Sequence, residues 1–301
     1  MRDVTPAMRE AIEAVASDRT HGAAWLAREA ANAMARAARE ADARTPQEMI
    51  AVLRDVAQAL AAAQPRMAAV SNAVGAVLLA AGTAAAADNV PAVRRAAVAQ
   101  VRRIVAGWEG NVRRIARHAQ TIVPNGPILT HSHSATVMAV LERLARRRAP
   151  IVVTESNPLG EGRTTALLLA SRGIPVRLIA DAQAGAFVSQ MAAVLVGADT
   201  VFADGAVVNK VGTLALALLA RERRVPFFVA SESLKVAPSR WEPTGETLPL
   251  DASPEAPPVV YFDVTPPRLI TALITEEGVF KPRQLTPLVR RARRWRRALS
   301  P

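Results

Sequence analysis

The sequence predicts an α/β protein in which an all-helical N-terminal domain precedes a parallel-sheet domain. Apolar residues recur at helical spacing up to about residue 118, and no strand-like alternation appears before residue 120. After Pro124 the chain changes to short apolar runs separated by segments of helix length, a pattern typical of parallel strands joined by crossover helices. We therefore expect a helical domain at 1–120, an α/β ligand-binding domain at 121–285 and a basic tail at 286–301.

The N-terminal domain has a well-marked helix start at Thr45. The run Thr45-Pro-Gln-Glu48 supplies a cap, a proline at the first helical position and a capping-box acid. This helix should end near Ala63, before the next proline. Apolar spacing predicts two further helices, within residues 21–44 and 93–118.

The second domain should alternate strands with helices. Strands are expected at Ile128–Thr130, Ile151–Thr154, Val176–Ala180, Thr200–Phe202, Phe227–Ala230 and Val259–Phe262. Helices are expected at 135–148, 163–172, 184–195, 212–222 and 266–274. Parallel sheets bind ligands at the carboxyl ends of their strands. Polar residues gather at these predicted ends, so we expect the functional site there.

Composition excludes several classes of protein. The chain has 301 residues, 50% of them hydrophobic, which is enough for two cored domains. It has no cysteine, hence no disulfide, thiolate metal site or cysteine nucleophile, and we expect a cytoplasmic location. No secretory signal follows Met1. The most apolar stretch, Ala73–Ala87, is short for a membrane span of roughly 20 residues, so no membrane association is expected.

The net charge of +12 is concentrated in the tail. Six arginines lie there, and without them the charge is 12 − 6 = +6. Only three lysines occur, so arginine replaces lysine almost everywhere, as a genome-level preference for arginine codons would produce. The tail could bind a polyanion, form a solvated helix end or make an oligomer contact. Because aromatic residues are only 4% of the chain, stacking on bases is disfavoured and we do not expect a nucleic acid partner.

The turn Thr130-His-Ser-His-Ser134 follows a predicted strand and precedes a predicted helix. Free backbone N–H groups at such a helix start can bind an anion, and the alternative is simple capping by Ser132 or Ser134. The spacing of His131 and His133 could suit a metal, but no other histidine is near in sequence. We expect neither a metal nor a cofactor.

Further polar residues mark the later strand ends. Arg163 could clamp a phosphate bidentately, or it could be a solvent-facing residue at a helix start. Lys210 follows Asn209 at a strand-to-helix junction, and a lysine in this arginine-rich chain indicates a need for a compact ammonium. Glu155 and Asp181 could orient ligand hydroxyls or cap the helices that follow.

At these motifs the chain resembles a known family. The family comprises the alpha, beta and delta subunits of translation initiation factor 2B, the archaeal ribose-1,5-bisphosphate isomerases and the methylthioribose-1-phosphate isomerases. The matching stretches are His21–Arg28, Ile128–Ser134, Thr154–Pro158, Gly173–Asp181, Gly197–Asp199, Asn209–Thr213, Ser231–Lys235 and Phe262–Pro267. Together they cover roughly residues 20 to 280.

The resemblance implies a Rossmann-like second domain, a homodimer or larger homo-oligomer, and a phosphosugar or nucleotide ligand between the domains. In the isomerases, an aldose phosphorylated at C1 becomes a ketose. The resemblance gives Asp204 and Ser132 as candidate catalytic residues. The candidate ligand-binding residues are Gly22, Ala23, His131, His133, Ser134, Glu155, Arg163, Asn209, Lys210 and Lys235.

The sequence departs from the isomerases at both catalytic positions. Ser132 stands where they have a cysteine, and a hydroxyl is a far weaker acid than a thiol. Asp204 lies in the loop of the isomerase aspartate, while the closest register to the methylthioribose-phosphate enzymes puts Ala206 at that place. Two functions therefore remain open: an isomerase of a C1-phosphorylated pentose, or a non-catalytic regulatory or assembly subunit that senses a phosphorylated metabolite.

Overall fold

The structure is a computed structural model that describes residues 5–18, 21–65, 67–145, 150–240 and 260–300. Its contacts divide the chain into two compact units. The first unit consists of Met1–Gly110, Leu234–Pro238 and Pro287–Pro301, and the second of Asn111–Ser233 and Ser239–Thr286. The helical N-terminal region and the mostly parallel sheet confirm the predicted fold class.

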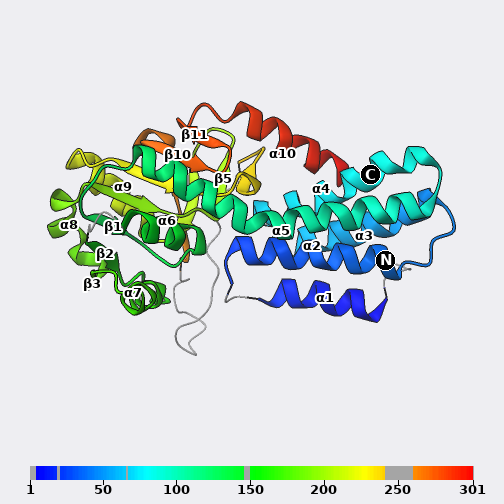
Figure 1. The fold of residues 1–301 in the computed structure, drawn as a ribbon, viewed down its shortest axis with the longest axis horizontal. Coiled ribbons are helices and arrows are strands. Elements are labelled where there is room, and N and C mark those ends of the chain that lie inside the picture. The colour runs from blue at the N-terminus through cyan, green and yellow to red at the C-terminus, as the bar shows by residue number, and fades with distance from the viewer. Residues whose placement is uncertain (1–4, 19–20, 66, 146–149, 241–259, 301) are drawn as a thin grey trace, which may run out of the picture. The chain divides into compact units, whose positions relative to one another are not determined.

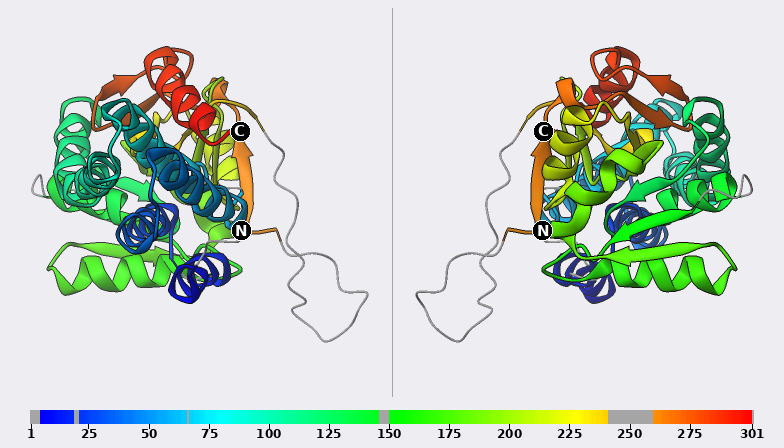
Figure 2. Two further views of the ribbon diagram at one scale, coloured as in Figure 1. Left: turned by 90° about the vertical axis from the view of Figure 1, so that its right-hand side faces the viewer. Right: turned by 90° about the vertical axis from the view of Figure 1, so that its left-hand side faces the viewer.

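The first unit is a helical bundle around one apolar core (Figures 1 and 2). Its elements are α1 (Pro6–Ser17), α2 (Ala23–Glu40), α3 (Pro46–Ala63), α4 (Ala68–Ala84), η1 (Ala85–Ala87), the first part of α5 (Val90–Ile122), η4 (Ser233–Lys235, shared at its first residue), β8 (Val236–Ala237) and α10 (Thr286–Ala298). The Thr45 capping box is confirmed, since the Glu48 backbone N–H donates to the Thr45 hydroxyl at 3.2 Å. One stretch, Ala68–Ala87, is long and apolar enough to cross a membrane by composition alone, but 67% of it is buried, as in a core helix.

The second unit is built on a seven-stranded sheet in the order β11-β10-β7-β4-β1-β2-β3. The strands are β1 (Ile128–Thr130), β2 (Ile151–Thr154), β3 (Val176–Ile179), β4 (Ala193–Val196), β7 (Phe227–Ala230), β10 (Ala272–Thr275) and β11 (Gly278–Phe280). All neighbours pair in parallel except β10 and β11. Strand order reverses between β1 and β4, which makes this the switch point where α/β sheets bind ligands.

Helices cover both faces of this sheet. The connecting elements are α6 (Ala135–Ala145), α7 (Glu161–Ser171), η2 (Asp181–Gln183), α8 (Ala184–Phe187), η3 (Val188–Gln190), α9 (Thr213–Glu222) and η5 (Pro267–Leu269). The end of α5, α6 and α7 share one core cluster with the sheet. Because parallel crossovers are right-handed, the reversal at the switch point puts α9 on the opposite face. The loops after β1 and β4 begin on either side of this reversal, and they approach closely: a Cβ on Gly197 would lie 3.2 Å from the Ser134 side chain.

Two predicted helices are too long. The segment 184–195 begins with α8 and η3, and 266–274 contains η5, but the two segments end in the buried strands β4 and β10. A short apolar run that is buried on both faces has no periodicity, so strand and helix cannot be told apart from spacing. The last predicted strand, Val259–Phe262, is also misplaced: the observed strand is β9, Phe262–Thr265, and Val259 lies outside the described residues.

The predicted strand at 200–202 exists, but it belongs to a separate antiparallel sheet. In the second unit β5 (Thr200–Phe202), β6 (Val207–Lys210) and β9 pair antiparallel in that order. The tight turn at Asp204 and Gly205, where Gly205 has φ +86°, reverses the chain after only three strand residues. This hairpin carries Asn209 and Lys210 to the start of α9.

Candidate functional site

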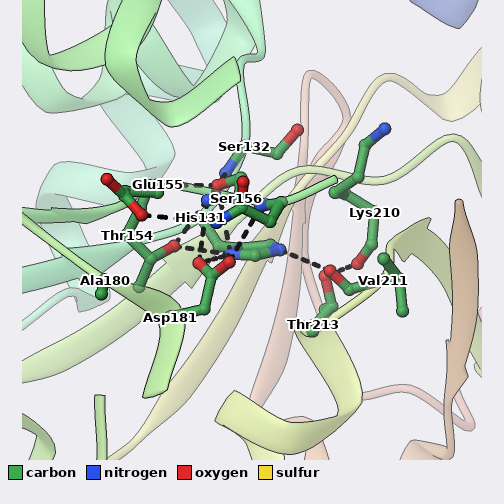
Figure 3. A network of polar contacts seen from close by, with 12 residues as sticks. His131, Ser132, Thr154, Glu155, Ser156, Ala180, Asp181, Lys210, Val211 and Thr213 are labelled. Carbon is green, nitrogen blue, oxygen red and sulfur yellow. Dashed lines mark hydrogen bonds and ion pairs between the residues drawn. The ribbon is translucent and has the colours of Figure 1, made fainter. Parts of the chain in front are cut away.

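His131, the first residue after β1, ties three segments together at the switch point (Figure 3). It is 3% exposed. Its Nε2 lies 2.8 Å from the carbonyl oxygen of Val211 and must donate the hydrogen bond, while Nδ1 lies 2.6 Å from the Thr154 hydroxyl, which donates to it in the neutral ring. Burial lowers the pKa of His131 despite the Val211 carbonyl and Asp181, so the neutral form is favoured.

The next residue, Ser132, and Ser156 after β2 both have left-handed backbones, with φ of 69° and 64°. The left-handed conformation is sparsely populated for residues with a side chain, and it persists where surrounding contacts hold the backbone in place. The Ser132 N–H donates to the Ser156 hydroxyl at 2.6 Å. The N–H groups of Ser156 and Asn157 donate to the two carboxylate oxygens of Asp181, each at 2.8 Å. Asp181 thus holds the neighbouring turn rather than reaching into open space.

Gly162 allows the end of β2 and the start of α7 to touch. A Cβ at Gly162 would lie 1.7 Å from the carbonyl oxygen of Thr154. The first turn of α7 therefore carries Glu161 and Arg163 directly onto the strand end. Arg163 forms an ion pair with Glu155, yet its side chain stays 63% exposed, so it could turn to a ligand.

Lys210 is a buried cation at the end of β6. Its side chain is 7% exposed, and Nζ lies 2.7 Å from Oε1 of Glu161. Nζ also lies 5.5 Å and 5.4 Å from the rings of Tyr261 and Phe262, within cation–π range. The second oxygen of Glu161 is buried and has no hydrogen-bond partner among the described residues. In Figure 3 the Lys210 ammonium and the Ser132 hydroxyl point to the same side of the network.

Three further residues lie near these strand ends: Asn209, His133 and Ser134. The Asn209 amide donates to the Thr213 hydroxyl at 3.0 Å. His133 Nδ1 lies 3.0 Å from the Thr165 hydroxyl, which donates to the Ser132 carbonyl at 2.9 Å, and burial lowers the pKa of His133. Ser134 caps α6, because its hydroxyl accepts from the Val137 N–H at 3.3 Å.

Asp263 on β9 already occupies the start of α9. It accepts hydrogen bonds from the N–H groups of Gly212 and Leu214 at 2.8 and 3.0 Å. Burial raises the pKa of Asp263 to about 6, against the lowering effect of those two hydrogen bonds. These N–H groups at the start of α9 are therefore already occupied by a carboxylate.

Sequence reasoning missed Glu161 and Asp263. Glu161 directly follows Gly160 and stands two residues before Arg163, and Asp263 lies in the stretch Phe262–Pro267, so both were within reach. Their roles depend on partners far along the chain: Lys210 lies 49 residues after Glu161, and Asp263 bonds residues 49 and 51 positions away. Local spacing carries no information about such pairs.

Asp204 lies apart from this network in the described structure. It is in the β5–β6 turn, where it accepts from the Ala206 N–H at 3.0 Å and pairs with Arg240 at 3.4 Å. Its side chain is 47% exposed. Neither of these two interactions involves Ser132 or Lys210.

The remaining predicted ligand residues belong to the first unit. Gly22 is the N-cap of α2 and provides no side-chain cap, and Ala23 opens that helix. Lys235 is 5% exposed. The fully buried Asn72 fixes the backbone on both sides of Lys235, donating to the carbonyl oxygens of Leu234 and Val236 at 2.7 and 2.8 Å.

Comparison with known proteins agrees with this architecture. The model of the initiation factor 2 subunit family matches residues 19–282. A ribose 1,5-bisphosphate isomerase of Haloferax volcanii is 33% identical over 95% of this chain and 93% of its own. A putative translation initiation factor eIF-2B subunit 2-like protein of Pyrococcus horikoshii is 31% identical, covering 91% of this chain and 96% of its own.

A solved structure shows the same fold. The crystal structure of 5-methylthioribose 1-phosphate isomerase from Pyrococcus horikoshii superposes with a TM-score of 0.75 at 25% identity, covering 94% of this chain and 87% of the other. The sequence match spans most of the chain, and the fold match includes both the helical region and the parallel sheet. The chain belongs to the initiation factor 2 subunit family.

Proposed function

We propose that this protein binds a pentose phosphorylated at C1 and converts it from aldose to ketose. The observation that carries the proposal is the arrangement at the switch point, where the Ser132 hydroxyl and the Lys210 ammonium point to one side of a buried network. The near full-length similarity to a ribose 1,5-bisphosphate isomerase supports the substrate class.

In the reaction the bond between C1 and the ring oxygen breaks and the ring oxygen takes up a proton. A hydrogen moves from C2 to C1, and the C2 hydroxyl loses its proton as the C2 carbonyl forms, so there is no net redox change. In this proposal Lys210 and Arg163 bind phosphate oxygens, because both are cations at the strand ends. Glu161 would release Lys210 to the phosphate. The neutral, fully bonded His131 holds the Ser132 turn in place instead of contacting the ligand.

Asp204 and Ser132 remain the proposed proton-transfer residues. Within the described ranges, the half-exposed Asp204 carboxylate interacts with its own turn and one exposed arginine, which leaves lone pairs for proton transfer. Gly22, Ala23, His133, Ser134, Glu155, Asn209 and Lys235 are the remaining proposed ligand residues. We also propose that the protein forms a homo-oligomer, which sedimentation velocity of the full chain would test.

A second function is favoured by one residue. Ser132 provides a hydroxyl where the family's isomerases have a thiol, and a hydroxyl gives up its proton far less readily. A protein that keeps the phosphate-binding cations but lacks the acid would sense a sugar phosphate or nucleotide without converting it. This non-catalytic function shares the ligand site and differs only in turnover.

One experiment separates the two functions. Ribose 1,5-bisphosphate is incubated with the wild-type protein, Asp204→Asn and Ser132→Cys, and the product is followed by ¹³C NMR. For an isomerase, Asp204→Asn should lower kcat by about 10²–10⁴-fold, the usual contribution of general acid–base catalysis. Ser171→Ala, an exposed serine at the end of α7, is the matched control and should retain full activity.

Ligand-induced thermal stabilisation reports binding independently of turnover. At a hundredfold excess of ligand over Kd it should reach about 2.7 kcal/mol. Stabilisation without conversion in the wild type would support the sensor, and conversion gained only in Ser132→Cys would show that the missing thiol is the cause. If no phosphosugar or nucleotide stabilises the protein, both functions are rejected.

A further inference from the structure

The largest concentration of charge outside the candidate site is at the end of the chain. Between Gly278 and Pro301 the sequence has eight lysines and arginines and no aspartate or glutamate. Six of these eight are arginines of the 13-residue helix α10. The charge therefore sits on one ordered element of the first unit.

The structure separates these arginines by face. Four of them are exposed: Arg290, Arg293, Arg294 and Arg297. They occupy positions i, i+3, i+4 and i+7, which lie on one side of a helix. We call these four residues the arginine face. Within the described part of the chain, none of their guanidinium groups forms an ion pair or hydrogen bond. The face extends over about 10 Å at 1.5 Å per residue.

The opposite side of α10 is fixed to the protein. Leu288, Val289 and Ala292 are buried. A Cβ on Gly75 of α4 would lie 2.4 Å from the Trp295 carbonyl oxygen, so the two helices are in backbone contact. Figure 1 shows α10, in red, running beside α4. The arginine face is thus held by a rigid element, which lowers the entropic cost of binding.

The arginine face has no internal compensation. Arginines at i, i+3 and i+4 repel each other, and this repulsion destabilises the helix unless a counter-charge is bound. Phosphate groups suit a guanidinium best, because they accept two parallel hydrogen bonds from its planar fork. We propose that the arginine face binds the phosphate backbone of a nucleic acid without reading its bases. Composition alone did not favour this partner; the common face of the four side chains does.

Other occupants fit less well. Insertion into a membrane surface requires an exposed apolar side, and the apolar residues of α10 are buried in the protein. At a symmetric contact through α10, a second copy would place its own four face arginines against these four, and like charges repel. Trp295 is half-buried and the Arg291 guanidinium lies 5.1 Å from its ring centre, so its ring is a poor platform for stacking a base. Contacts with phosphate alone are therefore expected.

The test is the salt dependence of binding by the full-length protein to a fluorescein-labelled oligoribonucleotide, followed by anisotropy. One arm uses a single strand of mixed sequence and the other its duplex. Replacing all four face residues (Arg290→Gln, Arg293→Gln, Arg294→Gln, Arg297→Gln) should weaken binding by about tenfold or more. It should also flatten the log–log salt slope by about 0.9 for each duplex phosphate that is no longer neutralised. Glutamine preserves helix propensity.

A matched control distinguishes an effect of the arginine face from an effect of net charge alone. Four exposed arginines elsewhere are replaced together: Arg95→Gln, Arg102→Gln, Arg117→Gln and Arg223→Gln. Both quadruple variants have a net charge of 12 − 4 = +8. The proposal requires the control to keep wild-type affinity. Equal weakening of both variants, tighter binding to phosphatidylserine vesicles or polyglutamate than to RNA, or no RNA binding by the wild type would overturn it.

Discussion

Two carboxylates in turns of the second unit, Asp181 and Asp204, serve the fold to very different extents. Asp181 accepts hydrogen bonds from Ser156 and Asn157, which lie 25 and 24 residues away, so it joins two strand ends of the parallel sheet. Among the described residues, Asp204 accepts from a residue two positions on and pairs with an exposed arginine. The fold depends on Asp181, whereas Asp204 keeps lone pairs available for chemistry.

Disruption of the parallel strand ends should have the largest effect on stability. Gly162→Ala would place a methyl group 1.7 Å from the Thr154 carbonyl oxygen, which forces α7 away from β2. We expect the free energy of unfolding in urea to fall by more than about 3 kcal/mol, beyond ordinary overpacking. In the control Gly185→Ala the methyl meets Leu219 at 3.8 Å, an ordinary contact, so the change should stay within about 1 kcal/mol. Equal stability of the two variants would contradict the close approach.

Asp263 provides the next largest effect, as a pH dependence. Its pKa in the folded protein is raised from 3.8 to about 6. Between these two pH values the folded state therefore binds more protons than the unfolded state. The contribution of Asp263 to the free energy of unfolding is full below pH 3.8 and is lost as pH rises through 6. At about 1.4 kcal/mol per pH unit, the wild type should lose about 2–3 kcal/mol over that window. Asp263→Asn should remove this pH dependence, which urea unfolding at several pH values would detect. The control variant Asp204→Asn should retain it.

Comparing Asp181→Asn with Asp204→Asn at neutral pH tests the contrast directly. An asparagine at 181 offers one acceptor oxygen to two backbone donors and loses the charge, so unfolding free energy should fall by about 2 kcal/mol. At the half-exposed position 204 the change should stay below about 0.5 kcal/mol. A reversed order would show that the fold depends on the β5–β6 carboxylate instead.

The smallest effect should come from His131. The pKa of His131 in the folded protein lies below 6.5, so the unfolded chain takes up a proton first as pH falls. The stability that His131 contributes above pH 6.5 is therefore lost as pH falls below that value. This slope opposes that of Asp263. His131→Gln should weaken the loss on acidification, measured by thermal unfolding between pH 5 and 7. The control is His21→Gln, at a side chain that is 47% exposed. An unchanged acid slope in His131→Gln would exclude His131 as its source.

Features set by local sequence could be predicted, whereas features that depend on distant partners could not. Strands β1, β2, β3 and β7 were placed correctly because prolines and glycines bound their apolar runs. His131, Ser132 and Asp181 are each predicted at the carboxyl end of a parallel strand, and hydrogen bonds through Ser156 connect Ser132 and Asp181 in the structure. The hairpin from β5 to β6 was not foreseen, since pairing partners in antiparallel sheets depend on contacts beyond spacing. Glu161 and Asp263 were missed for the same reason.

The contact between Gly75 and Trp295 has a consequence for synthesis on the ribosome. The first unit contains the N-terminal helices, yet it is completed by residues 234–238 and 287–301. The nascent helices of α1 to α4 therefore emerge long before the helix that covers α4 exists. Until the codons for α10 are translated, the α4 surface around Gly75 stays open to solvent and to chaperones. A premature stop before α10 would affect the N-terminal bundle as much as the C-terminal region itself.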